Sequence, residues 1–157
     1  MKTALLAIGK TDNPFYAQAI DHYRKKVLHY LPFELLVIPD LKNTRNLSES
    51  QQKEKEGELI LKNLQPGDYC VLLDEKGKEY TSEGFAAYME SKMQRVRKRL
   101  VFIAGGPYGF GQAVYGASSE SLSLSQMTFS HQMIRLLFVE QLYRAMTILQ
   151  NEPYHHR

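Results

Sequence analysis

The sequence contains a single cysteine, no apolar run of membrane-spanning length, and little excess charge of either sign. One cysteine, Cys70, excludes an internal disulfide framework and is typical of a protein in a reducing cytosol. We therefore predict a cytoplasmic protein that does not span a membrane. The net charge of +3 is small for 157 residues, so a surface that binds nucleic acid would have to be a local patch.

The chain also lacks internal repeats, low-complexity segments, and linkers rich in proline, glycine or serine. Its first ten residues briefly resemble a secretion signal, because Lys2 precedes apolar residues. The apolar run is short, however, Gly9 and Lys10 interrupt it, and no small-residue cleavage site follows. We interpret this stretch as a strand, and residues 1–157 as one domain.

Segments typical of strands and of helices alternate along the chain. Alternation of this kind favours an α/β fold, a parallel sheet flanked by helices. Ser48 and Ser82 are expected to cap the second and third helices, and residues 75–78 to form a turn. The predicted strands are 3–8, 33–38, 69–73, 100–104 and 121–125; the predicted helices are 14–30, 48–64, 82–93, 112–119 and 131–150.

Three possible motifs are interpreted as structural or as chance. Gly9-Lys10-Thr11 ends like a phosphate-binding loop, but Ala4 stands where that motif requires its first glycine. His155 and His156 are adjacent and lack acidic or cysteine partners at metal-ligand spacing, so we expect no metal site. Cys70 lies in an apolar run, which favours a buried structural thiol.

The stretch VFIAGGPYGFG (101–111) is more informative. A buried strand that runs into several glycines indicates a sharp turn or a close approach of the backbone to another group. Ligands bind at the carboxyl ends of strands in α/β sheets, although the spacing does not match a dinucleotide fingerprint. A glycine-rich turn without a ligand is the alternative.

The last helix carries cations on a largely apolar face. With Ser130 as the cap, His131 falls in the first turn, where the helix dipole favours a neutral imidazole. Arg135 lies one turn later, so it needs an anionic partner or a face that meets a ligand or another subunit. Arg144 stands four residues after Glu140, and an ordinary helix ion pair is the alternative to a functional role.

Six segments together resemble the RlmH family of SPOUT-class methyltransferases, which modify large-subunit ribosomal RNA. The resemblance runs from MKTALLAIGK to the last residue and is most specific from Leu122 to Ala145. The segments are LLDEKGK (72–78), TSEGFA (81–86), FIAGGPYG (102–109), LSLSQMTFSHQMIR (122–135), VEQLYRA (139–145) and the terminal PYHHR.

The resemblance implies a fold, a cofactor and a reaction. The C-terminal part of the α/β sheet would form a trefoil knot, an exception to the usual unknotted topology. The cofactor would be S-adenosylmethionine, and the reaction would methylate N3 of a pseudouridine in a hairpin of 23S rRNA in the assembled ribosome. The protein would work as a homodimer with its site at the subunit interface.

The resemblance also assigns site residues, motif by motif. Family members often carry proline before the histidine and another residue after GGP, whereas this chain has Ser130 and Tyr108. The implied cofactor contacts are Leu73, Gly105, Leu124, Ser125, Gln126, Met127, Thr128 and Phe129.

The candidate catalytic residues are His131, for proton removal or base positioning, together with Arg135 and Tyr154. Arg144, His155 and Arg157 are candidate contacts to RNA phosphate. The tail NEPYHHR suits a flipped base, and a frayed end is the alternative. Two basic clusters, 95–99 and 24–26, are further candidates, with a solvated surface as the alternative.

Two other functions remain open from the sequence. One is a SPOUT methyltransferase that acts on tRNA, although 157 residues leave little room for an added tRNA-binding domain. The other is a non-enzymatic module that docks on the ribosome, which would not need a cofactor slot.

Overall fold

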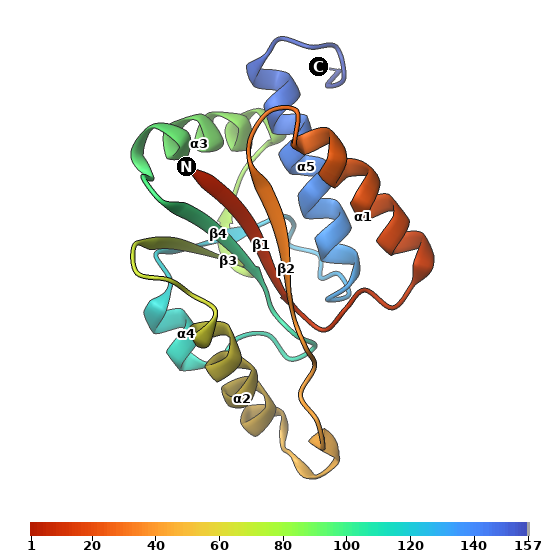
Figure 1. Ribbon diagram of the computed structural model, residues 1–157, viewed down its shortest axis with the longest axis vertical. Coiled ribbons are helices and arrows are strands. Elements are labelled where there is room, and N and C mark those ends of the chain that lie inside the picture. The colour runs from red at the N-terminus through yellow and green to blue at the C-terminus, as the bar shows by residue number, and fades with distance from the viewer. Residues whose placement is uncertain (157) are drawn as a thin grey trace.

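The computed structural model describes residues 1–156 as a five-stranded parallel sheet with helices on both faces (Figure 1). The strand order is β2-β1-β4-β3-β5, which confirms the predicted α/β class. The strands are β1 (Lys2–Ile8), β2 (Phe33–Ile38), β3 (Asp68–Glu79), β4 (Arg99–Ala104) and β5 (Glu120–Ser123). The helices are α1 (Pro14–Val27), η1 (Thr44–Asn46), α2 (Glu49–Lys62), α3 (Ser82–Arg95), α4 (Gln112–Ala117) and α5 (Met133–Leu149).

Two apolar layers enclose the sheet. Alternate residues of a strand face opposite sides, so in β1 Leu5 belongs to one buried cluster and Leu6 to the other. Helices α1, α3 and α5 cover the first face, and the pair α2 and α4 covers the second (Figure 1). Cys70 is buried in the second cluster, as predicted. No helix among residues 1–156 is both long and apolar enough to cross a bilayer.

The predicted turn at 75–78 is wrong, because these residues continue strand β3. The strand pairs with β5 on both sides of an irregularity between Leu73 and Lys78. Gly77 permits this close pairing: a Cβ there would lie 2.6 Å from the backbone nitrogen of Leu122. The irregular segment places Asp74 and Glu75 beside the loops that follow β4 and β5, which are described below.

Helix boundaries differ by a few residues from those expected. Helix α1 ends at Val27 rather than near residue 30, and α5 begins at Met133 rather than near residue 131. Helix α2 has the expected cap, because the Ser48 hydroxyl accepts from the backbone N–H of Gln51. Helix α3 is capped by Thr81 and not by Ser82.

Candidate functional site

A cavity of about 570 Å³ opens at the carboxyl ends of β3, β4 and β5. Its wall includes residues 73–75 in the irregular part of β3, the glycine loop (residues 105–109), and the loop that connects β5 to α5. The volume lies within the range of about 300–1,000 Å³ that is usual for small-molecule sites. Its position at the strand ends is where ligands bind in α/β sheets.

The cavity brings together most of the residues assigned from the resemblance. Ser125 and Gln126 are not among its lining residues. The Ser125 hydroxyl instead accepts a hydrogen bond from the backbone N–H of Met127 at 3.0 Å, which shapes the loop. The assigned residues that do line it are Leu73, Gly105, Leu124, Met127, Thr128, Phe129 and His131.

The glycine loop makes the tight approaches that the sequence predicted. Gly109 has a φ of +82°, and its N–H donates to the carbonyl of Gly106 at 3.2 Å. A Cβ at Gly105 would lie 3.2 Å from the ring of Phe110, which also lines the cavity. The loop therefore has little room for a side chain at its first glycine.

Sequence reasoning missed an acidic part of the cavity wall. Glu49, Asp74 and Glu75 line it, and neither lysine nor arginine occurs among the lining residues that the structure describes. The Tyr115 hydroxyl donates to Asp74, and burial, together with that carboxylate, raises the pKa of Tyr115 to about 12. Asp74 and Glu75 stand directly after Leu73 in LLDEKGK, so that motif contained the signal.

His131 lies in the turn before α5 and not in the first helical turn. Ser130 still acts as a cap, because its hydroxyl accepts from the N–H of Met133 at 3.0 Å. Burial lowers the pKa of His131, and the Arg135 guanidinium lowers it further. The Asp40 carboxylate acts in the opposite direction but does not cancel these two effects. The favoured neutral imidazole is as predicted, but burial rather than the helix end is its main cause.

A change of His131 to glutamine should make the protein less sensitive to acid. A folded-state pKa below the ordinary 6.5 means that protonation favours the unfolded chain. The stability that depends on a neutral His131 is therefore fully present above pH 6.5, and it is lost as the pH falls through the folded-state pKa. Thermal melts from pH 8 to pH 5 should show a smaller fall in Tm for His131→Gln than for the wild type. The exposed His29→Gln should follow the wild type, and an identical fall in all three proteins would contradict the prediction.

Arg135 is fully buried, and backbone carbonyls are its main partners. Its guanidinium donates to the carbonyls of Ile8 at 2.7 Å and Gly9 at 2.6 Å. It also donates to the His131 carbonyl at 3.2 Å and to the Thr11 hydroxyl at 3.3 Å. These contacts satisfy the side chain within one protomer without a ligand or a second subunit, and the carboxylates of Asp40 and Asp12 favour its charged form. Arg135 ties α5 to the end of β1 and is absent from the cavity wall.

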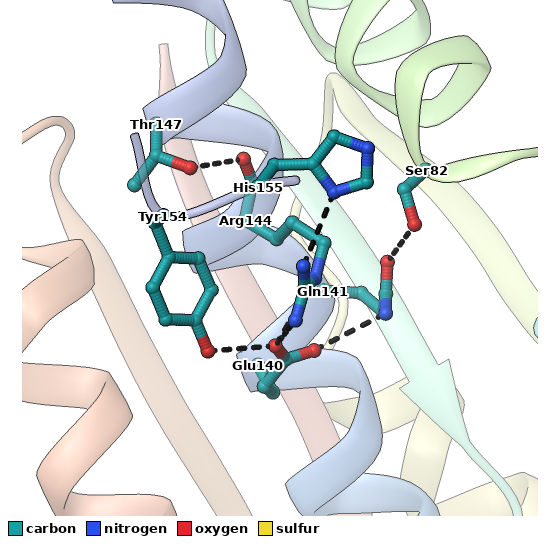
Figure 2. A network of polar contacts seen from close by, with 7 residues as sticks. All are labelled: Ser82, Glu140, Gln141, Arg144, Thr147, Tyr154 and His155. Atoms are coloured by element: carbon teal, nitrogen blue, oxygen red, sulfur yellow. Dashed lines mark hydrogen bonds and ion pairs between the residues drawn. The ribbon is translucent and has the colours of Figure 1, made fainter. Parts of the chain in front are cut away.

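The C-terminal tail is held against α5 by a polar network (Figure 2). Arg144 pairs with Glu140 at 2.6 Å, which confirms the helix ion pair, and the Tyr154 hydroxyl donates to the same carboxylate at 2.8 Å. His155 Nδ1 lies 3.1 Å from Arg144, and the Tyr154 ring packs edge-on against Tyr143. The frayed-end alternative is wrong for the tail up to residue 156. Arg157 lies outside the described residues.

The candidate basic clusters are partly engaged in ion pairs. Arg99 is buried and pairs with Asp68 at 2.6 Å, so it does not belong to an exposed patch. Arg24 and Lys25 both contact Asp21.

Helix α5 lies between the candidate catalytic residues in the sequence. His131 precedes the helix and Tyr154 follows it, and Figure 1 places the C-terminus at the far end of α5 from the strand ends. The tail folds back along the helix, because the Tyr154 hydroxyl bonds to Glu140 near the middle of α5. Tyr154 is nevertheless absent from the cavity wall of its own protomer.

A parallel α/β sheet with a cavity built from glycine-rich and irregular loops at its strand ends is consistent with the SPOUT methyltransferases, and the family comparison identifies that class. The sequence model described as "Predicted SPOUT methyltransferase" matches residues 1–155. The chain is 69% identical over 156 residues to a ribosomal RNA large subunit methyltransferase H of Parabacteroides distasonis, with 99% of each chain covered. It is 61% identical over 156 residues to the protein of that name from Bacteroides fragilis, with 99% of each chain covered. The protein of that name from Flavobacterium johnsoniae is 56% identical over 157 residues, with 100% of each chain covered. The chain belongs to this family, and the membership implies the C-terminal trefoil knot.

Proposed function

We propose that the protein transfers the methyl group of S-adenosylmethionine to N3 of a pseudouridine in a hairpin of 23S rRNA, in the assembled ribosome of the cytoplasm. The observation that carries the proposal is the cavity. It gathers Leu73, Gly105 and four residues of the 124–129 loop, the segments that resemblance assigns to the cofactor. The relatives' names support large-subunit rRNA as the substrate class.

The charge of the cavity wall fits this cofactor. S-adenosylmethionine carries a sulfonium and an ammonium group, whereas the product of the transfer has lost the sulfonium charge. A wall with Glu49, Asp74 and Glu75, and with neither lysine nor arginine among its described residues, favours a cationic ligand. The glycine loop supplies backbone groups for polar contacts at close range.

The chemistry requires a methyl donor and an acceptor for the N3 proton. The bound cofactor supplies an electrophilic methyl group. His131 lines the cavity with its imidazole favoured in the neutral form, so it can accept the N3 proton or hold the base in position. The walls of the cavity align donor and acceptor, and positioning of this kind accounts for a large share of such rate enhancements.

The separation of the tail from the cavity supports a homodimer with a shared site. Tyr154 is absent from the cavity wall of its own protomer, so we infer that a tail that acts on the substrate serves the partner's cavity. Apolar side chains also stand exposed at the mouth of the cavity, among them Tyr108 at 43%, Met127 at 76% and Phe129 at 42% exposure. A second subunit or the substrate would cover them.

Methyl transfer from radiolabelled S-adenosylmethionine tests the proposal directly. The acceptors are whole ribosomes, separated subunits, free 23S rRNA and tRNA. We expect label in whole ribosomes, at N3 of one pseudouridine of 23S rRNA, and light scattering should give the mass of a dimer. Label in tRNA alone would point to a tRNA methyltransferase, and absence of both labelling and cofactor binding would point to a ribosome-docking module.

The change Gly105→Val should abolish cofactor binding. The Cβ alone would lie 3.2 Å from the Phe110 ring and 3.4 Å from the Gly109 carbonyl carbon, and the valine methyl groups have no further room. The loop must shift, and we expect the affinity for S-adenosylmethionine to fall by about 100-fold or more.

Titration calorimetry gives the affinity, and circular dichroism checks that the fold persists. Gly116→Val is the matched control, because nothing lies within 4 Å of a Cβ at that position. Cofactor affinity at the wild-type value in Gly105→Val would exclude this loop as the binding site.

A further inference from the structure

Glu56 of α2 is a buried acidic residue with few partners. Its exposed fraction is 4%, and no group among residues 1–156 bonds to its Oε1. Its Oε2 accepts only a long hydrogen bond, 3.4 Å, from the Gln52 side chain. A buried polar atom without a partner opposes folding. Burial raises the pKa of Glu56, and the Asp40 carboxylate acts in the same direction. The stability of the fold does not explain this residue.

The carboxyl group of Glu56 lies directly against the glycine loop. A Cβ at Gly106 would come within 2.6 Å and 2.7 Å of the two carboxyl oxygens. Gly106 does not have a positive φ, so backbone conformation does not require glycine there. The Glu56 carboxyl group imposes that requirement, because it occupies the space that a side chain would fill.

Gly106 lines the cavity, whereas Glu56 does not. An effect of Glu56 on a ligand must therefore act through the loop, which lies between the carboxyl group and the cavity. The backbone of the loop lies closest to the ligand. On the other side of the loop, Oε1 of Glu56 is an acceptor without a donor among residues 1–156.

We propose that Glu56 is a positioning residue for the methyl-donor site. Its carboxyl group supports the glycine loop from beneath, and its free Oε1 accepts a hydrogen bond from the loop backbone when the cavity is occupied. This inference depends on the proposed function, because it assumes that S-adenosylmethionine binds in the cavity. The unfavourable burial of Glu56 is retained because it fixes the shape of the loop.

Glu56→Leu tests the proposal, because leucine keeps the bulk of the side chain and removes both acceptors. The Tm should stay level or rise, since an unpaired buried acceptor is gone. The affinity for S-adenosylmethionine should fall by about tenfold, which corresponds to about 1.4 kcal/mol. Glu56→Gln keeps one oxygen in place and should restore most of the affinity.

Two controls make the outcome decisive. Wild-type protein that fails to bind S-adenosylmethionine would refute the proposed function itself, independently of Glu56. Glu58→Leu, on the exposed side of the same helix, should leave the affinity unchanged. If Glu56→Leu lowers the Tm and the affinity together, or leaves the affinity at the wild-type value, Glu56 is a structural residue and the proposal is wrong.

A double-mutant cycle tests the contact itself. Gly106→Ala alone should weaken cofactor binding, because its Cβ meets the carboxyl oxygens at 2.6 Å. In a Glu56→Ala background the oxygens are absent, so the further loss caused by Gly106→Ala should be smaller. Additive losses would show that the two residues do not act through one contact.

Discussion

Replacement of Arg135 by alanine is expected to lower the free energy of unfolding by about 3–5 kcal/mol, the largest single loss among the variants considered. The side chain is among the largest that are fully buried, so its removal leaves a cavity in the layer between α5 and the sheet. It also leaves the carbonyls of Ile8 and Gly9 without their donor, at 2.7 Å and 2.6 Å. Both effects oppose folding.

Urea denaturation monitored by circular dichroism measures the loss. Arg135→Lys should recover part of it, because an ammonium group can reach one carbonyl but cannot match the planar, multiple donors of a guanidinium. Arg24→Ala, which removes a partly exposed pair with Asp21, should leave the free energy of unfolding nearly unchanged. A stable Arg135→Ala protein that is merely monomeric would instead restore the view that this side chain serves the dimer.

The sequence predicted most of the strands because their apolar runs are continuous. Strand β4 and the first part of β3 are buried on both faces, and such runs carry a clear signal. The extension of β3 through Lys78 was missed because that segment is polar and contains Gly77, features that are typical of a turn. Only the backbone of β5 beside Gly77 reveals why glycine stands there.

The candidate site was predictable where a motif lies in one loop, and not where a contact joins distant segments. The 124–129 loop and Gly105 were assigned from the family resemblance, which rests on short motifs, each contiguous in the sequence. The two shortest contacts of Arg135 are to backbone carbonyls 126 and 127 residues away, and such carbonyls leave no trace in the residue types. The proximity of Glu56 to Gly106 could not be predicted from the sequence either, because it depends on how α2 packs against the sheet.

Removal of the tail after Asn151 should leave the fold and the cofactor affinity nearly unchanged and lower methylation of ribosomes by about 100-fold. The tail packs on α5 through Tyr154, whose hydroxyl bonds to Glu140 at 2.8 Å, and stability should fall only slightly. Stacking of a flipped base on an aromatic ring contributes about 1–3 kcal/mol to binding. Tyr154→Ala should therefore reproduce much of the loss of methylation. Tyr154→Phe keeps the ring and should lose less.

Tyr30→Phe is the matched control for the tail. It removes the bond from the Tyr30 hydroxyl to Glu152 at 2.7 Å, and so loosens the tail without changing its aromatic ring. Methylation should stay near the wild-type rate in this variant. If the truncated protein methylates ribosomes at the full rate, the tail serves only to cover the end of α5.

Coexpression of two inactive variants distinguishes a shared site from a site within one protomer. Gly105→Val removes the cofactor cavity and leaves the tail, whereas truncation after Asn151 removes the tail and leaves the cavity. Random assembly gives about half mixed dimers. If the dimer is twofold-symmetric and its sites are shared, each mixed dimer has one intact cavity facing one intact tail and one site that lacks both. The mixture should therefore show about a quarter of the wild-type rate. A site within one protomer cannot give this result, because each chain lacks one of the two parts. A rate no higher than that of either variant alone would place the tail and the cavity in separate functions.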